Sequence, residues 1–130
     1  VVVPTAALRT QMARDFLDPE MRERIGHSFS IMEQGNTYDP SRNTDGYCIT
    51  YQSAAMDSAG LNAAELERHN YLLCCDEIHH VRRGGSWHRG LQPLVERAKK
   101  VILLSGSPER GDLAPIALLP YKIKETQYES

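Results

Sequence analysis

Five short apolar runs recur along the chain, and small or polar residues and then a helix-like stretch follow most of them. The runs lie at 1–3, 29–32, 47–49, 71–75 and 101–104, and the run at 29–32 is the weakest. Most are continuous rather than alternating, which is typical of strands that are covered on both faces of a parallel sheet. The pattern therefore predicts an α/β sandwich in which strands alternate with helices.

The stretches between the runs carry helix signals. After Pro4, Thr5 can cap a helix whose apolar residues at 8, 12 and 16 fall on one face. A second helix is predicted between Asp18-Pro19 and a stop at Gly26. Two more are predicted from a capping-box-like pair, Asn62 with Glu65, and from an apolar face at 91, 94, 95 and 98. The segment 35–46 has the composition of a loop.

Composition narrows the class of protein. The chain has 130 residues, of which 41% are hydrophobic, and a formal net charge of −2. These values indicate one folded domain and exclude general disorder and a histone-like basic binder. No apolar run approaches the length of a membrane span, and 1–3 is too short for a secretion signal. Three cysteines form no disulfide framework, so a soluble, reducing, cytoplasmic setting is expected.

Polar chemistry follows four of the apolar runs directly. In parallel α/β sheets, ligands bind beyond the carboxyl ends of the strands. The segments that follow those ends here are Pro4-Thr5, Thr50–Ser53, Asp76–His80 and Ser105–Pro108. Packing alone does not explain four polar segments at one edge, so this edge is the predicted site.

The pair Asp76-Glu77 is the strongest signal at that edge. A buried strand that ends in two carboxylates suits a Mg²⁺–nucleotide site, because one carboxylate can hold the metal while the other orients and deprotonates a water molecule. The alternative is a helix N-terminus, where acidic residues interact favourably with the helix dipole.

Several motifs resemble those of superfamily 2 helicases of the DEAD/DEAH type. Asp76–His79 is similar to motif II, the DExH form of the Walker B box, and residues 105–112 (SGSPERGD) resemble motif III. Residues 1–11 resemble motif Ia, and residues 49–53 (ITYQS) resemble the segment between Ia and II. Residues 116–121 are similar to the stretch after motif III in phage, excision-repair and type III restriction helicases. The resemblance implies a three-layer RecA-like sandwich with a mostly parallel sheet.

The resemblance also implies roles for individual residues. Asp76 would engage Mg²⁺, and Glu77 would activate the water that hydrolyses ATP. The residues implied to couple nucleotide state to the partner domain are His79, Ser105, Ser107 and Arg110. Those implied to grip the backbone of a nucleic-acid strand are Pro4, Thr5, Arg9, Thr50 and Gln52. Simple helix capping is an alternative for Thr5, and ordinary strand-end hydrogen bonding is one for Thr50 and Gln52.

One expected element is absent from the sequence. The phosphate-binding loop GxxxxGK[ST] does not occur, and Gly84-Gly85 is followed by Ser86-Trp87 with no lysine. We therefore expect residues 1–130 to be part of a first RecA-like domain that is incomplete at its nucleotide-binding edge, without the second motor domain. The parent would be an ATP- and Mg²⁺-dependent helicase or translocase, acting on DNA rather than RNA, and this piece alone would be inactive.

Other groups of residues are alternative candidate sites. A metal-dependent hydrolase could use the cluster of Asp76, His69, His79, His80 and His88, although no HExxH spacing occurs. A serine nucleophile lacks the GxSxG motif, and the cysteines at 48, 74 and 75 have the pattern of core residues. The basic stretch 82–100, which includes Trp87, is either a nucleic-acid-facing loop or a solvated face. A non-catalytic nucleic-acid-binding remnant of the same fold is a further alternative.

Overall fold

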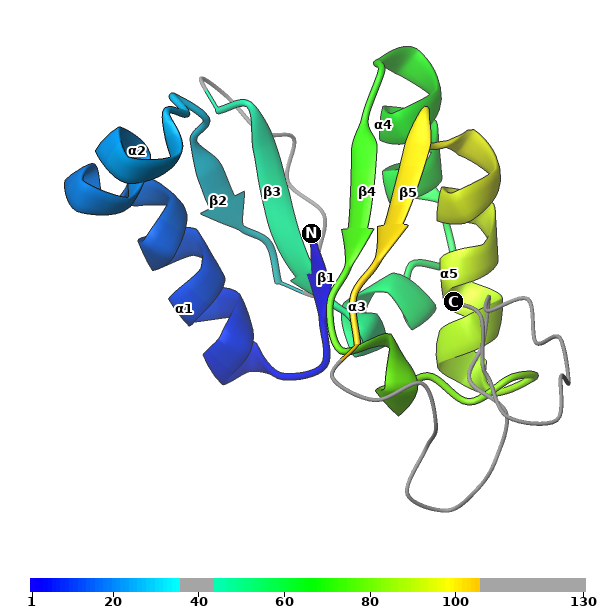
Figure 1. Ribbon diagram of the computed structural model, residues 1–130. Coiled ribbons are helices and arrows are strands. Elements are labelled where there is room, and N and C mark those ends of the chain that lie inside the picture. Colours follow the sequence, from blue (N-terminus) through cyan, green and yellow to red (C-terminus); the bar gives the residue numbers. More distant parts are fainter. Residues whose placement is uncertain (36–43, 106–130) are drawn as a thin grey trace, which may run out of the picture.

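A computed structural model of the chain describes residues 1–35 and 44–105, and its centre is a five-stranded sheet (Figure 1). All pairs are parallel, in the order β2-β3-β1-β4-β5. The strands are β1 (Val2–Val3), β2 (Ile31–Glu33), β3 (Gly46–Thr50), β4 (Leu72–Cys75) and β5 (Lys100–Leu103). Each predicted apolar run supplies one strand, so the prediction of a parallel sheet is confirmed.

Helices connect the strands and cover both faces of the sheet. β1 leads through α1 (Ala6–Leu17) and α2 (Pro19–Ile25) to β2, whereas β3 leads through α3 (Tyr51–Ala55) and α4 (Leu61–Arg68) to β4. These two crossovers run in opposite directions along the sheet, so right-handed connections place their helices on opposite faces. The short 3₁₀ turn η1 (Ile78–His80) and α5 (Ser86–Arg97) then join β4 to β5. The predicted three-layer α/β arrangement is confirmed.

The helix ends follow local hydrogen-bonding rules, with one correction. Thr5 caps α1 by accepting a 3.2 Å hydrogen bond from the Leu8 amide, and Gly26 ends α2 in the left-handed conformation that glycine adopts without strain. The predicted capping box at Asn62 is wrong. The Asp57 carboxylate instead accepts hydrogen bonds from the amides of Leu61 and Asn62 at the start of α4.

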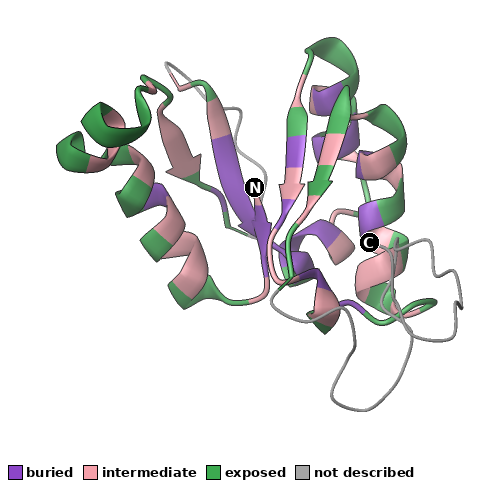
Figure 2. Ribbon diagram, viewed as in Figure 1, coloured by how far each residue is buried: buried purple, intermediate pink, exposed green. Residues whose placement is uncertain are grey.

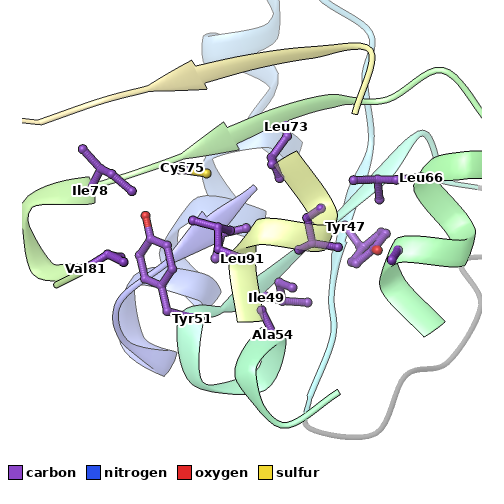
Figure 3. Close-up of a cluster of buried hydrophobic side chains, with 13 residues drawn as sticks. Tyr47, Ile49, Tyr51, Ala54, Leu66, Leu73, Cys75, Ile78, Val81 and Leu91 are labelled. Atoms are coloured by element: carbon purple, nitrogen blue, oxygen red, sulfur yellow. The ribbon is translucent and has the colours of Figure 1, made fainter. Parts of the chain in front are cut away.

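The main core lies where β1, β3 and β4 face α3, α4 and α5 (Figures 2 and 3). Tyr51, Ile78 and Leu91 are its largest fully buried side chains. The helices α3 and α5 pack closely because α5 carries glycine at position 90. A Cβ atom at Gly90 would lie 2.5 Å from the Cα of Ala55.

β5 is an end strand of the sheet in the described part of the chain. Among the described residues this strand pairs only with β4, and Ile102 on its surface is 42% exposed. Within those same residues, no helix has the length and apolar character needed to cross a membrane.

Candidate functional site

The carboxyl ends of four adjacent strands meet at one edge of the sheet. Val3 of β1 lies beside Thr50 of β3, and the Asp76 amide donates a 2.8 Å hydrogen bond to the carbonyl of Val2. The chain that leaves β5 stays beside the chain that leaves β4, because the Ile78 amide donates to the Leu104 carbonyl at 2.9 Å. The segments that follow β1, β3, β4 and β5 therefore share one edge, as predicted.

The side chain of Tyr51 holds the backbone of the acidic pair Asp76-Glu77 in place. Tyr51 is the first residue of α3 and is fully buried, and its hydroxyl donates a 2.7 Å hydrogen bond to the backbone carbonyl of Asp76. Burial raises the pKa of Tyr51 far above its usual value, so the hydroxyl remains a donor at every physiological pH. The Asp76 side chain itself is only partly buried at the end of β4.

Glu77, His79 and Ser105 come together in a chain of close polar contacts. Glu77 has a positive φ of 52°, which is uncommon for a residue other than glycine. Its Oε2 lies 3.2 Å from His79 Nε2, and His79 Nδ1 lies 2.9 Å from the Oγ of Ser105. The segment after β4 is thus joined to the segment after β5. The predicted residues Ser107 and Arg110 lie outside the described part of the chain.

The histidines separate into two groups. His80 Nε2 lies 4.0 Å from Glu77 Oε2, so Glu77, His79 and His80 form a cluster of metal-ligating side chains. The other two histidines proposed for a metal site lie elsewhere. His69 ends α4 near Glu65, and His88 accepts a hydrogen bond from the Gly84 amide. Asp76 is not part of the cluster found among the described residues.

The residues implied to grip nucleic acid are largely engaged within the fold. The hydroxyls of Thr5 and Thr50 cap α1 and α3, and Thr50 is buried. Arg9 pairs with Glu33 at 3.3 Å and donates a 2.9 Å hydrogen bond to the carbonyl of Gln34. The capping alternative is therefore observed for Thr5, and the alternative of strand-end hydrogen bonding for Thr50 takes the form of a cap on α3. Pro4 is partly buried at the turn between β1 and α1.

Gln52 differs from these residues because its side chain is exposed. Its Oε1 accepts a 2.9 Å hydrogen bond from Trp87 Nε1, and the Trp87 ring stacks on Tyr51 with ring centroids 5.4 Å apart. This bond leaves the amide NH₂ group of Gln52 as a donor on its other side. The sequence showed Trp87 among basic residues, but a partner 35 positions away could not be identified from spacing.

Several residues of the basic stretch 82–100 are engaged within the fold. Arg97 lies 3.8 Å from Glu67 and 3.7 Å from Glu96, and Arg89 donates to the carbonyl of Gly84. Arg82 and Arg83 are exposed on the segment between η1 and α5. Trp87 follows this segment, in the first turn of α5.

The thiols are protected by burial. Cys48 and Cys75 are fully buried, and desolvation raises the pKa of Cys48 to about 11 and that of Cys75 to about 12. A thiol with such a raised pKa is not an activated nucleophile. The interpretation as core residues is confirmed for Cys48 and Cys75, whereas Cys74 is only partly buried.

Comparison with known proteins gives one family and a few distant relatives. Residues 1–110 match the family described as "type III restriction enzyme, res subunit". An uncharacterized protein of Mycobacterium tuberculosis is 27% identical over 124 residues, which are 94% of this chain and 19% of that protein. An uncharacterized protein of Mycobacterium leprae is 26% identical over 125 residues, 95% of this chain and 20% of that protein. The chain thus spans about a fifth of the length of these relatives. No solved structure matches it.

Proposed function

This chain belongs to the family of the type III restriction enzyme res subunit, and on that premise we propose that it is part of the first motor domain of an ATP-dependent DNA helicase or translocase. The family is one of superfamily 2 helicases, so the resemblance found in the motifs is confirmed. In this proposal, residues 1–130 supply motifs Ia, II and III. The phosphate-binding loop and the second motor domain belong to other parts of the full-length protein.

The observation that carries the proposal is the position of Asp76 and Glu77. They follow β4, which lies between β1 and β5, and they are joined through His79 to Ser105 after β5. Ligands of parallel sheets bind at this edge. Two carboxylates at the end of an interior strand, connected to the neighbouring segment, are among the parts that nucleotide hydrolysis requires.

The donor set at this edge suits Mg²⁺, which prefers carboxylate oxygens. Asp76 is the residue that would hold the ion, because Tyr51 and Val2 fix its backbone on both sides. Bound Mg²⁺ would neutralise negative charge on the phosphates of ATP. Glu77 would accept a proton from the attacking water, and its carboxylate is accessible enough to contact a water molecule.

His79 has a positioning role in this proposal. Its ring touches the Glu77 carboxylate on one side and the Ser105 hydroxyl on the other. A shift of Ser105 would therefore move the His79 ring and, with it, the carboxylate of Glu77. This arrangement supports coupling between the nucleotide site and the segment that follows β5.

DNA would bind at the surface formed by α3 and the start of α5. Gln52 offers amide donors there, and Arg82 and Arg83 add positive charge nearby. Amide and guanidinium donors suit phosphate contacts, which carry no sequence information. Thr50 acts through its cap on α3 rather than by direct contact, because its hydroxyl is buried.

The test is Glu77→Gln in the full-length protein. This change keeps the size of the side chain but removes the proton acceptor, so we expect ATP binding to persist while turnover falls by at least about 100-fold. ATP binding is measured by calorimetry and turnover by phosphate release. Glu67→Gln, an exposed change on α4, is the matched control and should retain turnover. Normal hydrolysis by the Glu77 variant would contradict the role of Glu77.

A further inference from the structure

We propose that Glu77, His79 and His80 form a binding site for a divalent transition-metal ion such as Zn²⁺. One ligand atom from each residue lies within 4.8 Å of the other two. Glu77 Oε2 is 3.2 Å from His79 Nε2 and 4.0 Å from His80 Nε2. Ligand atoms of a tetrahedral zinc ion, each about 2.1 Å from the metal, lie about 3.4 Å from one another. Only small side-chain movements separate the observed cluster from that geometry.

The local backbone builds this cluster. Glu77 stands immediately before η1 with a left-handed φ of 52°, and its carbonyl accepts a 3.0 Å hydrogen bond from the His80 amide. This bond closes the turn, so the side chains at positions 77, 79 and 80 converge although they are almost adjacent in sequence. The buried Ile78, between them, anchors the turn in the core (Figure 3).

Ser105 is not a ligand of the proposed metal site, but it contacts one of the ligands, His79. Its Oγ lies 2.9 Å from His79 Nδ1 and can accept a hydrogen bond from that nitrogen. In the tautomer that carries the proton on Nδ1, Nε2 offers its lone pair on the side of the Glu77 carboxylate, where a metal ion would take both groups as ligands. A metal-binding histidine usually donates its other ring N–H to a nearby polar group in this way.

The chemistry of the ligands selects the class of ion. Two imidazoles and one carboxylate are typical of sites for Zn²⁺, Fe²⁺ and Co²⁺, whereas Mg²⁺ and Ca²⁺ prefer oxygen ligands alone. The side chains of Glu77, His79 and His80 are 39%, 22% and 50% exposed, so an ion has access from solvent. Three protein ligands leave at least one position for water.

This site has a consequence that rests on the function proposed above. A metal ion on Glu77 occupies the carboxylate that would accept the proton from water. Zn²⁺ would therefore inhibit ATP turnover in the full-length protein, even in the presence of Mg²⁺.

The experiment measures metal binding by this chain in the absence of nucleotide. Zn²⁺ is titrated by calorimetry and Co²⁺ by its visible absorption, both in millimolar Mg²⁺. We expect one ion per chain. His80→Asn should weaken binding at least tenfold, and Ser105→Ala should weaken it by about tenfold through the orientation of His79. His69→Asn is the matched control, because His69 is also exposed and lies 3.8 Å from a glutamate, Glu65, but has no second histidine beside it.

Three results would overturn the site. They are the absence of a single binding event, equal effects of His80→Asn and His69→Asn, and displacement of Zn²⁺ by millimolar Mg²⁺. Both histidines are exposed, so circular dichroism should show the same fold in each variant. A chain that binds one Zn²⁺ while the full-length protein hydrolyses no ATP would support the metal site and contradict the proposed function.

Discussion

The hydroxyl of Tyr51 donates a 2.7 Å hydrogen bond to the backbone carbonyl of Asp76, 25 residues further along the chain. This bond connects α3, which follows β3, to the acidic segment that follows β4. The Tyr51 ring also stacks on Trp87 at the start of α5. One buried side chain therefore links the predicted magnesium ligand to the predicted DNA surface.

Replacing Tyr51 with Phe should lower both stability and turnover. The change removes one buried hydrogen bond, so the free energy of unfolding should fall by about 1–2 kcal/mol in urea denaturation. ATP turnover of the full-length protein should also fall, because the Asp76 backbone loses its support. Tyr71→Phe is the control, since it removes a 3.0 Å hydrogen bond to Glu65. Equal turnover in the two variants would show that Tyr51 does not position Asp76.

Replacing Gln52 with Ala should weaken binding of single-stranded DNA. The variant loses the exposed amide donors that Trp87 orients. We expect affinity to fall about fivefold, as for the loss of roughly 1 kcal/mol, in fluorescence anisotropy with a labelled oligonucleotide. Gln92→Ala is the matched control, because Gln92 is exposed on α5 beside Glu96. Trp87 is the sole tryptophan, so a change in its emission reports the lost contact with Gln52.

Gly90→Ala should destabilise the packing of α3 against α5. The added Cβ would lie 2.5 Å from the Cα and 2.8 Å from the amide nitrogen of Ala55, and these backbone atoms cannot move aside as a side chain can. We expect a loss of about 1–3 kcal/mol in the free energy of unfolding. Gly46→Ala adds the same atom where nothing lies within 4 Å, and thermal denaturation should barely change. A neutral Gly90 variant would contradict the observed closeness of the helices.

Stability should fall at alkaline pH because of the buried thiols. Burial raises the pKa of Cys75 from 9.0 to about 12 and that of Cys48 to about 11, so each thiol ionises more readily in the unfolded chain. The folded state keeps its full advantage below pH 9 and loses it as the pH rises from 9 towards 11. The expected loss is up to about 1.4 kcal/mol per pH unit for each thiol. Urea midpoints under reducing conditions measure it, and Cys75→Ala should make the slope shallower.

The strands could be predicted because most of them lie on continuous apolar runs, and the pairing of Val3 with Thr50 is that of a parallel sheet. The short helix α3 was not predicted, because its five residues carry no apolar period and Thr50 caps it inside a segment that resembles a strand end. The start of α4 was misassigned because the Asp57 carboxylate lies close enough to displace the weaker cap at Asn62. The local sequence alone does not show which of the two side chains, Asp57 or Asn62, caps the helix.

The residues of the candidate site also fall into those that the sequence could predict and those that it could not. Asp76, Glu77 and His79 could be predicted as candidates because they lie within four residues directly after a strand. The contacts of Tyr51 with Asp76 and of Trp87 with Gln52 could not, because each depends on how α3 and α5 pack. The convergence of Glu77, His79 and His80 depends on a left-handed backbone angle that a glutamate rarely adopts.

The edge of β5 that faces away from β4 affects the tendency of the isolated chain to self-associate. Ile102 and Leu104 are 42% and 45% exposed there, beside backbone groups that have no neighbouring strand among the described residues. An unpaired apolar edge is a template for a strand from another molecule. We therefore expect self-association to rise with concentration, and a Lys substitution at Ile102 should suppress it, because a charged edge side chain disfavours such pairing.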